Sequence, residues 1–195
     1  MAEIKSTMEM VLARASHLAT NAPAVPDNEE SMKIGMHLAA EFMAGRSENP
    51  LAGLEDQPSE KQEDIRRGAV QVLLRNVVLP RDEQLRETSE QALHALQLLG
   101  GDDKTTIAIQ ELDQILGQYN KHLEQSQQQL DDAIKAQLKQ QAVARGMNLN
   151  DEDLNPAMHP QYAEELHKLQ TELNGQYNDA MDERKQTIGS GFGLN

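Results

Sequence analysis

The chain has 195 residues, of which 38% are hydrophobic and 3% aromatic, and its formal net charge is −14. It lacks the Lys and Arg clusters that hold nucleic-acid backbones or anionic membrane surfaces, so we expect neither partner. The absence of cysteine excludes disulfides, thiolate metal sites and cysteine nucleophiles. So few aromatic residues favour thin seams between helices over a thick globular core.

The first hundred residues predict a small bundle of about four short helices. Apolar residues recur at helical spacing over 4–19, 28–44, 59–80 and 82–99. Asn28 is placed to cap the second helix and Gly45 to end it, and Ser59 with Gln62 has the spacing of a capping box. Pro80 and the Gly100–Gly101 pair are placed to stop the third and fourth helices.

Residues 103–144 predict one unusually long amphipathic helix. The segment has no proline, and a narrow apolar seam runs along it from Leu112 to Leu138, with Ser126 filling one seam position. Gly146 is placed to end the helix. Such a seam needs a partner helix to cover it.

A last helix over 161–186 supplies that partner from within the chain. Its apolar residues have matching spacing when the two helices are laid antiparallel. That pairing sets Tyr162 against Leu138, Tyr177 against Leu123, Arg184 against Leu116 and Ile188 against Leu112. The prediction is a long antiparallel, coiled-coil-like hairpin, although a three-helix arrangement would use the same residues. Between the helices, residues 147–160 predict a long polar turn with one helical turn at most.

The predicted organisation is therefore all-α. Residues 1–101 form a small helical bundle, residues 102–188 a long hairpin, and residues 189–195 a flexible tail with three glycines.

No catalytic, cofactor or metal motif is complete. Glu164 and His167 have the spacing of one half of a di-iron carboxylate motif, but no other histidine has a glutamate three residues before it. The segment 148–155 is rich in oxygen ligands yet lacks the glycine and glutamate of an EF-hand loop. We therefore expect no cofactor and no enzymatic activity.

Methionines and the tail supply candidate partner contacts. Methionine is flexible and polarisable, and it is common on surfaces that accept varied partner helices. The alternative is that these methionines fill a small core that lacks aromatic residues. The candidate contacts are Met8, Met32, Met36 and Met43 in the first two helices, and Phe192 and Leu194 in the tail.

The segment from Glu3 to Met8 (EIKSTM), running into a short amphipathic helix, resembles the start of some uncharacterised bacterial helical proteins. The resemblance covers about the first 15 residues and implies no activity.

The sequence also bears on location. Charged residues at Glu3, Lys5, Glu9 and Arg14 interrupt what would be the apolar core of a signal peptide, and no apolar run approaches the ~20 residues that span a bilayer. We expect a cytoplasmic protein.

These observations favour a non-enzymatic protein–protein interaction module, such as a scaffold, an adaptor or a chaperone-like binder. Its partners would be proteins of unknown identity, and an antiparallel homodimer of hairpins is one form of binding. The alternative is a helical-bundle enzyme or small-ligand carrier with its site in the N-terminal bundle. A third option is a secreted effector, or a structural part of a phage or secretion apparatus.

Overall fold

The structure is a computed structural model that describes residues 27–147, 150 and 154–194. Over these ranges the helices are α2 (Asp27–Met43), α3 (Ser59–Asn76), α4 (Glu83–Leu99), α5 (Asp103–Ala144), the short 3-10 helix η2 (Pro156–Met158) and α6 (Tyr162–Gly191). The predicted all-α fold class is confirmed, since the described residues contain no strand. The first predicted helix, over 4–19, lies outside the described residues.

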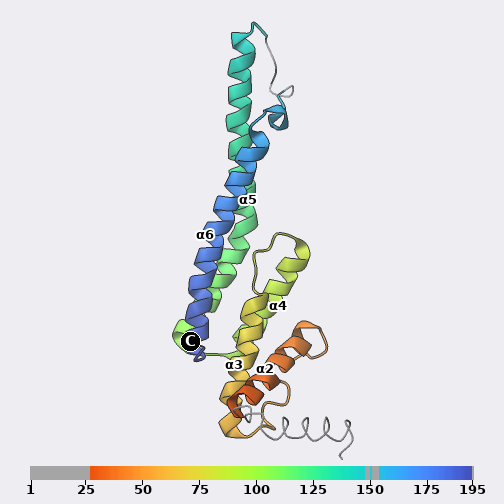
Figure 1. Cartoon of the computed structure of the whole chain (residues 1–195), viewed down its shortest axis with the longest axis vertical. Coiled ribbons are helices and arrows are strands. Elements are labelled where there is room, and N and C mark those ends of the chain that lie inside the picture. The colour runs from red at the N-terminus through yellow and green to blue at the C-terminus, as the bar shows by residue number, and fades with distance from the viewer. Residues whose placement is uncertain (1–26, 148–149, 151–153, 195) are drawn as a thin grey trace, which may run out of the picture.

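The long helix and the last helix form an antiparallel hairpin that extends well beyond the bundle (Figure 1). We call α5, η2 and α6 together the arm. Its base, at Asp103 and Gly191, lies beside α3 and α4, and its far end carries Ala144. The bounds of α5 match the prediction. The Asp102 carboxylate caps its start by accepting a hydrogen bond from the Thr105 backbone N–H at 2.8 Å, and Gly146, with φ +74°, follows its end.

The bundle is held by two helices whose backbones touch. A Cβ atom on Gly35 of α2 would lie 1.8 Å from the carbonyl oxygen of Ile65 in α3. A Cβ on Gly68 of α3 would lie 2.0 Å from the carbonyl oxygen of Met32 in α2. Only glycine permits this approach at either position, so each helix carries a glycine where it crosses the other.

Helix α3 departs from its predicted ends. Pro58 occupies the N-cap position without a side-chain hydrogen bond, and Ser59 is the first helical residue, so the predicted capping box is wrong. The Gln62 amide instead donates to the Gln57 carbonyl at 3.0 Å. The helix stops at Asn76, before Pro80, because the backbone of Val78 bonds to the Ser89 hydroxyl in α4 through its N–H at 3.0 Å and its carbonyl at 2.9 Å.

The C-terminal glycines also differ from the prediction. We expected residues 189–195 to form a flexible tail, but α6 continues through Gly191. Gly193, with φ +72°, then closes the helix: its N–H bonds to the Ser190 carbonyl at 3.0 Å, and the Leu194 N–H bonds to the Gly189 carbonyl at 2.8 Å. This is a Schellman cap, in which the glycine provides the left-handed conformation. The Arg67 guanidinium in α3 donates to the Phe192 carbonyl at 3.1 Å and fixes the cap to the bundle.

One apolar core joins the bundle to the base of the arm. It includes Leu73 of α3, Leu96 of α4, Leu112 of α5 and Ile188 of α6. Burial decreases sharply along the arm. Beyond Tyr119, the described apolar residues of α5 that are buried are Ile134 and Ala142, and before Leu173 no described residue of α6 is buried. None of the described helices has an apolar stretch long enough to cross a lipid bilayer.

Candidate interaction surface on the arm

All three tyrosines of the chain form polar contacts across the arm's seam. The Tyr119 hydroxyl donates to the Asn174 side chain at 2.7 Å, and the Tyr162 hydroxyl donates to the Asp131 carboxylate at 2.7 Å. The Tyr177 hydroxyl lies 3.2 Å from the His122 ring, and the rings of Tyr119 and Tyr177 meet edge to face at 5.3 Å. These contacts fix how α6 lies along α5.

The observed contacts lie one to two helical turns from the predicted pairs: Tyr162, for example, meets Asp131, seven residues from its predicted partner Leu138. The Tyr177 ring packs on Tyr119, four residues from its predicted partner Leu123, and Arg184 reaches the Glu111 carboxylate at 3.1 Å instead of Leu116. Apolar residues at every third or fourth position do not distinguish two registers of α6 along α5 that differ by one helical turn. In both registers each leucine meets another leucine. Directional hydrogen bonds do not tolerate that shift.

The far end of α5 extends past the start of α6. The first residue of α6, Tyr162, bonds to Asp131, and α5 continues to Ala144, about 20 Å further at 1.5 Å per residue. The segment around η2 packs against α5, and Leu154 and His159 on either side of η2 are buried. Val143, Met147 and Met158 remain exposed in this part of the arm.

A hollow of about 500 Å³ opens between α5 and α6 near the middle of α5. It forms where the small Ser126 side chain takes a seam position that elsewhere holds leucine. Its floor includes Leu130, Leu169 and Leu173, and its rim includes Glu165, Lys168 and Glu172. The seam leucines on both sides of the hollow, Leu123 and Leu166, are only partly buried. Two helices alone do not cover this seam.

The exposed side of α5 away from the seam includes a line of uncharged positions. This line, which we call the outer stripe, has steps of seven or four residues and is exposed at every position. Its members are Ile107, Gln114, Gln118, Gln125, Gln129, Ala136 and Val143. Asp113 and Glu124 lie about 100–120° from the line through Ile107 and Val143, whereas Asp132 and Lys139 lie within about 40° of it at 3.6 residues per turn. Its two large apolar residues, Ile107 and Val143, make the outer stripe a candidate surface for contact with another protein.

The bundle lies on a different side of α5 from the outer stripe. A hollow of about 260 Å³ between α4 and α5 is lined by Arg86 of α4 and by Asp113, Gly117 and Asn120 of α5. These three α5 residues point about a third of a turn away from the stripe at 3.6 residues per turn. The outer stripe and the hollow at Ser126 are therefore free of the chain's own bundle.

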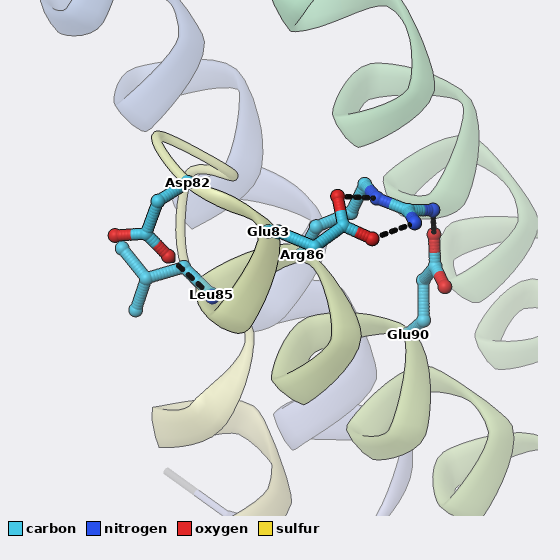
Figure 2. A network of polar contacts seen from close by, with 5 residues as sticks. All are labelled: Asp82, Glu83, Leu85, Arg86 and Glu90. Atoms are coloured by element: carbon cyan, nitrogen blue, oxygen red, sulfur yellow. Dashed lines mark hydrogen bonds and ion pairs between the residues drawn. The ribbon is translucent and has the colours of Figure 1, made fainter.

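That smaller hollow carries a polar network at the start of α4 (Figure 2). The Asp82 carboxylate caps the helix by accepting from the Leu85 N–H at 2.8 Å. The Arg86 guanidinium donates to both Glu83 and Glu90, at 2.6 Å to the latter. The Glu83 carboxylate raises the pKa of Arg86, and Arg86 in turn lowers the pKa of Glu83. All three side chains are exposed, so solvent screens these ion pairs and they contribute little to the stability of α4.

The residues predicted as partner contacts lie elsewhere. Met8 is outside the described residues, and Met32 and Met36 are partly buried on α2. Met43, Phe192 and Leu194 pack against the core, so they contribute to the chain's own packing. Their role in binding a partner stays a prediction.

The residues considered for metal binding lie on the surface of the last helix. Glu164 and His167 are both exposed on α6. Within the described parts of the chain, no three His, Asp or Glu residues gather in a way that could hold a metal ion.

Sequence reasoning missed the outer stripe because it followed only the seam. The signal was available: Ile107 and Val143 are large apolar residues that fit neither the seam of α5 nor a solvated surface. The interruption of the seam at Ser126 was recognised, but not the hollow that it leaves.

Comparison with known proteins assigns a family. The sequence profile of DUF6657, a family of unknown function, matches residues 51–190. The chain belongs to this family. The DUF6657 match takes in α3, α4, α5 and α6 up to Ser190, that is, the arm and the helices that support its base, and it leaves out α2. No curated protein and no solved structure matches the chain.

Proposed function

We propose that this protein is a non-enzymatic protein–protein interaction module and that the arm is its binding element. The observation that carries the proposal is the hollow with a leucine floor between α5 and α6, together with the exposed Ile107 and Val143 of the outer stripe. These apolar side chains gain little from folding while they stay in contact with water. A partner helix lying along the arm would cover them.

The interior of the bundle supports this function over the alternative of an enzyme or ligand carrier. A buried polar cluster facing a cavity would favour the alternative. Among the described residues of the bundle, the buried polar side chains are Ser31 and Ser89. The Ser89 hydroxyl is bonded to the backbone of residue 78, so it has a structural role. The remaining interior is packed with Ala, Val, Leu, Ile and Phe.

Affinity capture from the native source tests the proposal. The wild-type chain is compared with a Gln118→Lys/Gln125→Lys variant, which puts two charges on the outer stripe, and with Glu124→Lys as a control outside the stripe. We expect partner proteins with the wild type and the control and their loss with the stripe variant. The same proteins recovered with all three chains would exclude the outer stripe as the binding surface. A bound small molecule without any protein partner would favour the carrier.

The proposed place of action is the cytoplasm. Support comes from the absence of cysteine, which is compatible with a reducing compartment. Cell fractionation with an antibody against the chain tests this location.

A further inference from the structure

We propose that the junction between the bundle and the arm holds a binding site for a small acid with an apolar body, that is, a carboxylate attached to an apolar group. The site is a hollow of about 320 Å³ between the α3–α4 connection, the first turn of α4 and α6. A free carboxylic acid and the C-terminus of a protein both have this chemistry. The proposal goes beyond the interaction function of the arm, because it uses neither the outer stripe nor the hollow at Ser126.

The charges of this hollow are unusual for an acidic chain. The sequence has 32 acidic and 18 basic residues, yet the charged residues that line the hollow are Arg81 and Lys185. Four other hollows on the described surface each have at least one Asp or Glu in their lining. Two cations without a carboxylate beside them favour an anionic ligand.

Both cations lack an anionic partner in the part of the chain that the structure describes. None of the ion pairs among the described residues includes Arg81 or Lys185. Lys185 is partly buried, and burial lowers the pKa of its ammonium group, while the charge of Asp182 on the same helix opposes this shift only in part. A carboxylate in the hollow would supply the missing counter-charge.

The rest of the lining is mainly apolar. Leu79 and Met181 are 3% and 1% exposed, and both belong to the core that joins the bundle to the arm. Val78 and Leu85 line the hollow beside them and are only partly buried. An apolar group placed in the hollow would therefore leave water and cover these side chains, which favours a ligand with an apolar body.

The two walls are fixed before any ligand binds. The Ser89 hydroxyl in α4 bonds to the backbone N–H and carbonyl of Val78 at 3.0 and 2.9 Å, which holds the connection that carries Arg81. Across the hollow, Met181 and Lys185 are four residues apart and lie on one face of α6. A preformed site loses less free energy to ordering when a ligand binds.

A carboxylate suits these groups better than a phosphate. It accepts charge-assisted hydrogen bonds from a guanidinium or an ammonium group, and the Asn178 amide, which also lines the hollow, can donate a further one. A phosphate carries up to about two charges and costs more to remove from water. The volume of about 320 Å³ is at the lower end of the usual range of ligand pockets, so the ligand is small or is the end of a longer chain.

Calorimetric titration of the full chain with octanoate tests the site. Octanamide has the apolar part without the charge, and acetate has the charge without the apolar part. We expect saturable binding of octanoate below its micelle concentration, tighter than that of either control by about tenfold or more. A peptide that ends in a free leucine carboxylate, compared with the same peptide with an amidated end, tests a protein C-terminus as the source.

Lys185→Gln and Arg81→Gln each remove one of the two charges. Lys168→Gln is the matched control, because it makes the same change at an exposed position of α6 about 25 Å away. Each site variant should weaken binding by about tenfold or more, and the control should leave it unchanged. Arg81 is exposed, so its variant should keep the fold, which circular dichroism checks for all three.

Equal binding by the wild type and the two site variants would overturn the proposal. The absence of saturable binding for both octanoate and the peptide would also overturn it. The Gln118→Lys/Gln125→Lys variant should bind octanoate as the wild type does, since its changes lie on the outer stripe. A failure of this site is therefore distinguishable from a failure of the interaction function of the arm.

Discussion

At the scale of single residues, the tyrosines determine what the leucines leave open. Burying a leucine stabilises any register that keeps it in the seam, whereas a hydroxyl bonded at 2.7 Å to one side chain stabilises one register only. Tyr119 is almost fully buried, so its hydroxyl needs the Asn174 partner that it has. The arm thus combines a non-specific apolar seam with a few specific polar contacts.

Tyr162 gives a prediction for alkaline pH. Its hydrogen bond to the Asp131 carboxylate, helped by desolvation, raises its pKa above the ordinary value of 10.0. The folded arm favours the protonated phenol, so this contribution to stability is fully present below pH 10 and is lost as pH rises through the raised pKa. Phenolate absorbance should show that Tyr162→Phe removes an ionisation above pH 10. Asp131→Asn should move that ionisation back towards 10. An ionisation at or below 10 lost with Tyr162→Phe would contradict the hydrogen bond.

At the scale of elements, glycines inside helices have two different roles. Gly35 and Gly68 lie where α2 and α3 touch, and a methyl group there would overlap a backbone carbonyl. Gly117 in α5 and Gly175 in α6 have no atom within 4 Å of the position of a Cβ. The first pair permits packing, whereas the second only lowers the helix propensity of the arm.

Alanine substitutions at these positions should therefore have opposite signs. Gly35→Ala and Gly68→Ala should destabilise the protein by about 1–3 kcal/mol, because a backbone cannot move aside as a flexible side chain does. Gly117→Ala and Gly175→Ala should stabilise it by about 0.5–1 kcal/mol. Urea unfolding followed by circular dichroism measures all four variants. Stabilisation by Gly68→Ala would mean that the two helices do not touch there.

The end of α6 shows how an element depends on its surroundings. The glycines after Ile188 have low helix propensity, which is why the sequence predicts a tail. In the structure Gly189 is buried, and a Cβ on Gly191 would lie 2.0 Å from the Thr105 hydroxyl oxygen, so these glycines let the end of α6 approach the start of α5. The helix continues because packing against α5 and the cap at Gly193 outweigh propensity.

At the scale of the whole molecule, stability should be uneven. One core joins the bundle to the base of the arm, whereas the far half of the arm has few buried side chains. Regions with few buried contacts open at a lower free energy than the global unfolding. Amide hydrogens in residues 120–144 and 162–172 should therefore exchange at least about tenfold faster than those in residues 105–119, a difference of 1.4 kcal/mol. Uniform protection along α5 would contradict the uneven stability.

The sequence by itself determined the helical class, the place of most helix ends and the antiparallel arm. Apolar periodicity and stops such as Gly146 are local signals, and they act whatever surrounds them. Only the tertiary structure decided the register of the arm, the glycine contact between α2 and α3, the helical end at Gly191 and the free outer stripe. Each of these depends on residues far apart in the chain, whose contacts outweigh local propensity once they form.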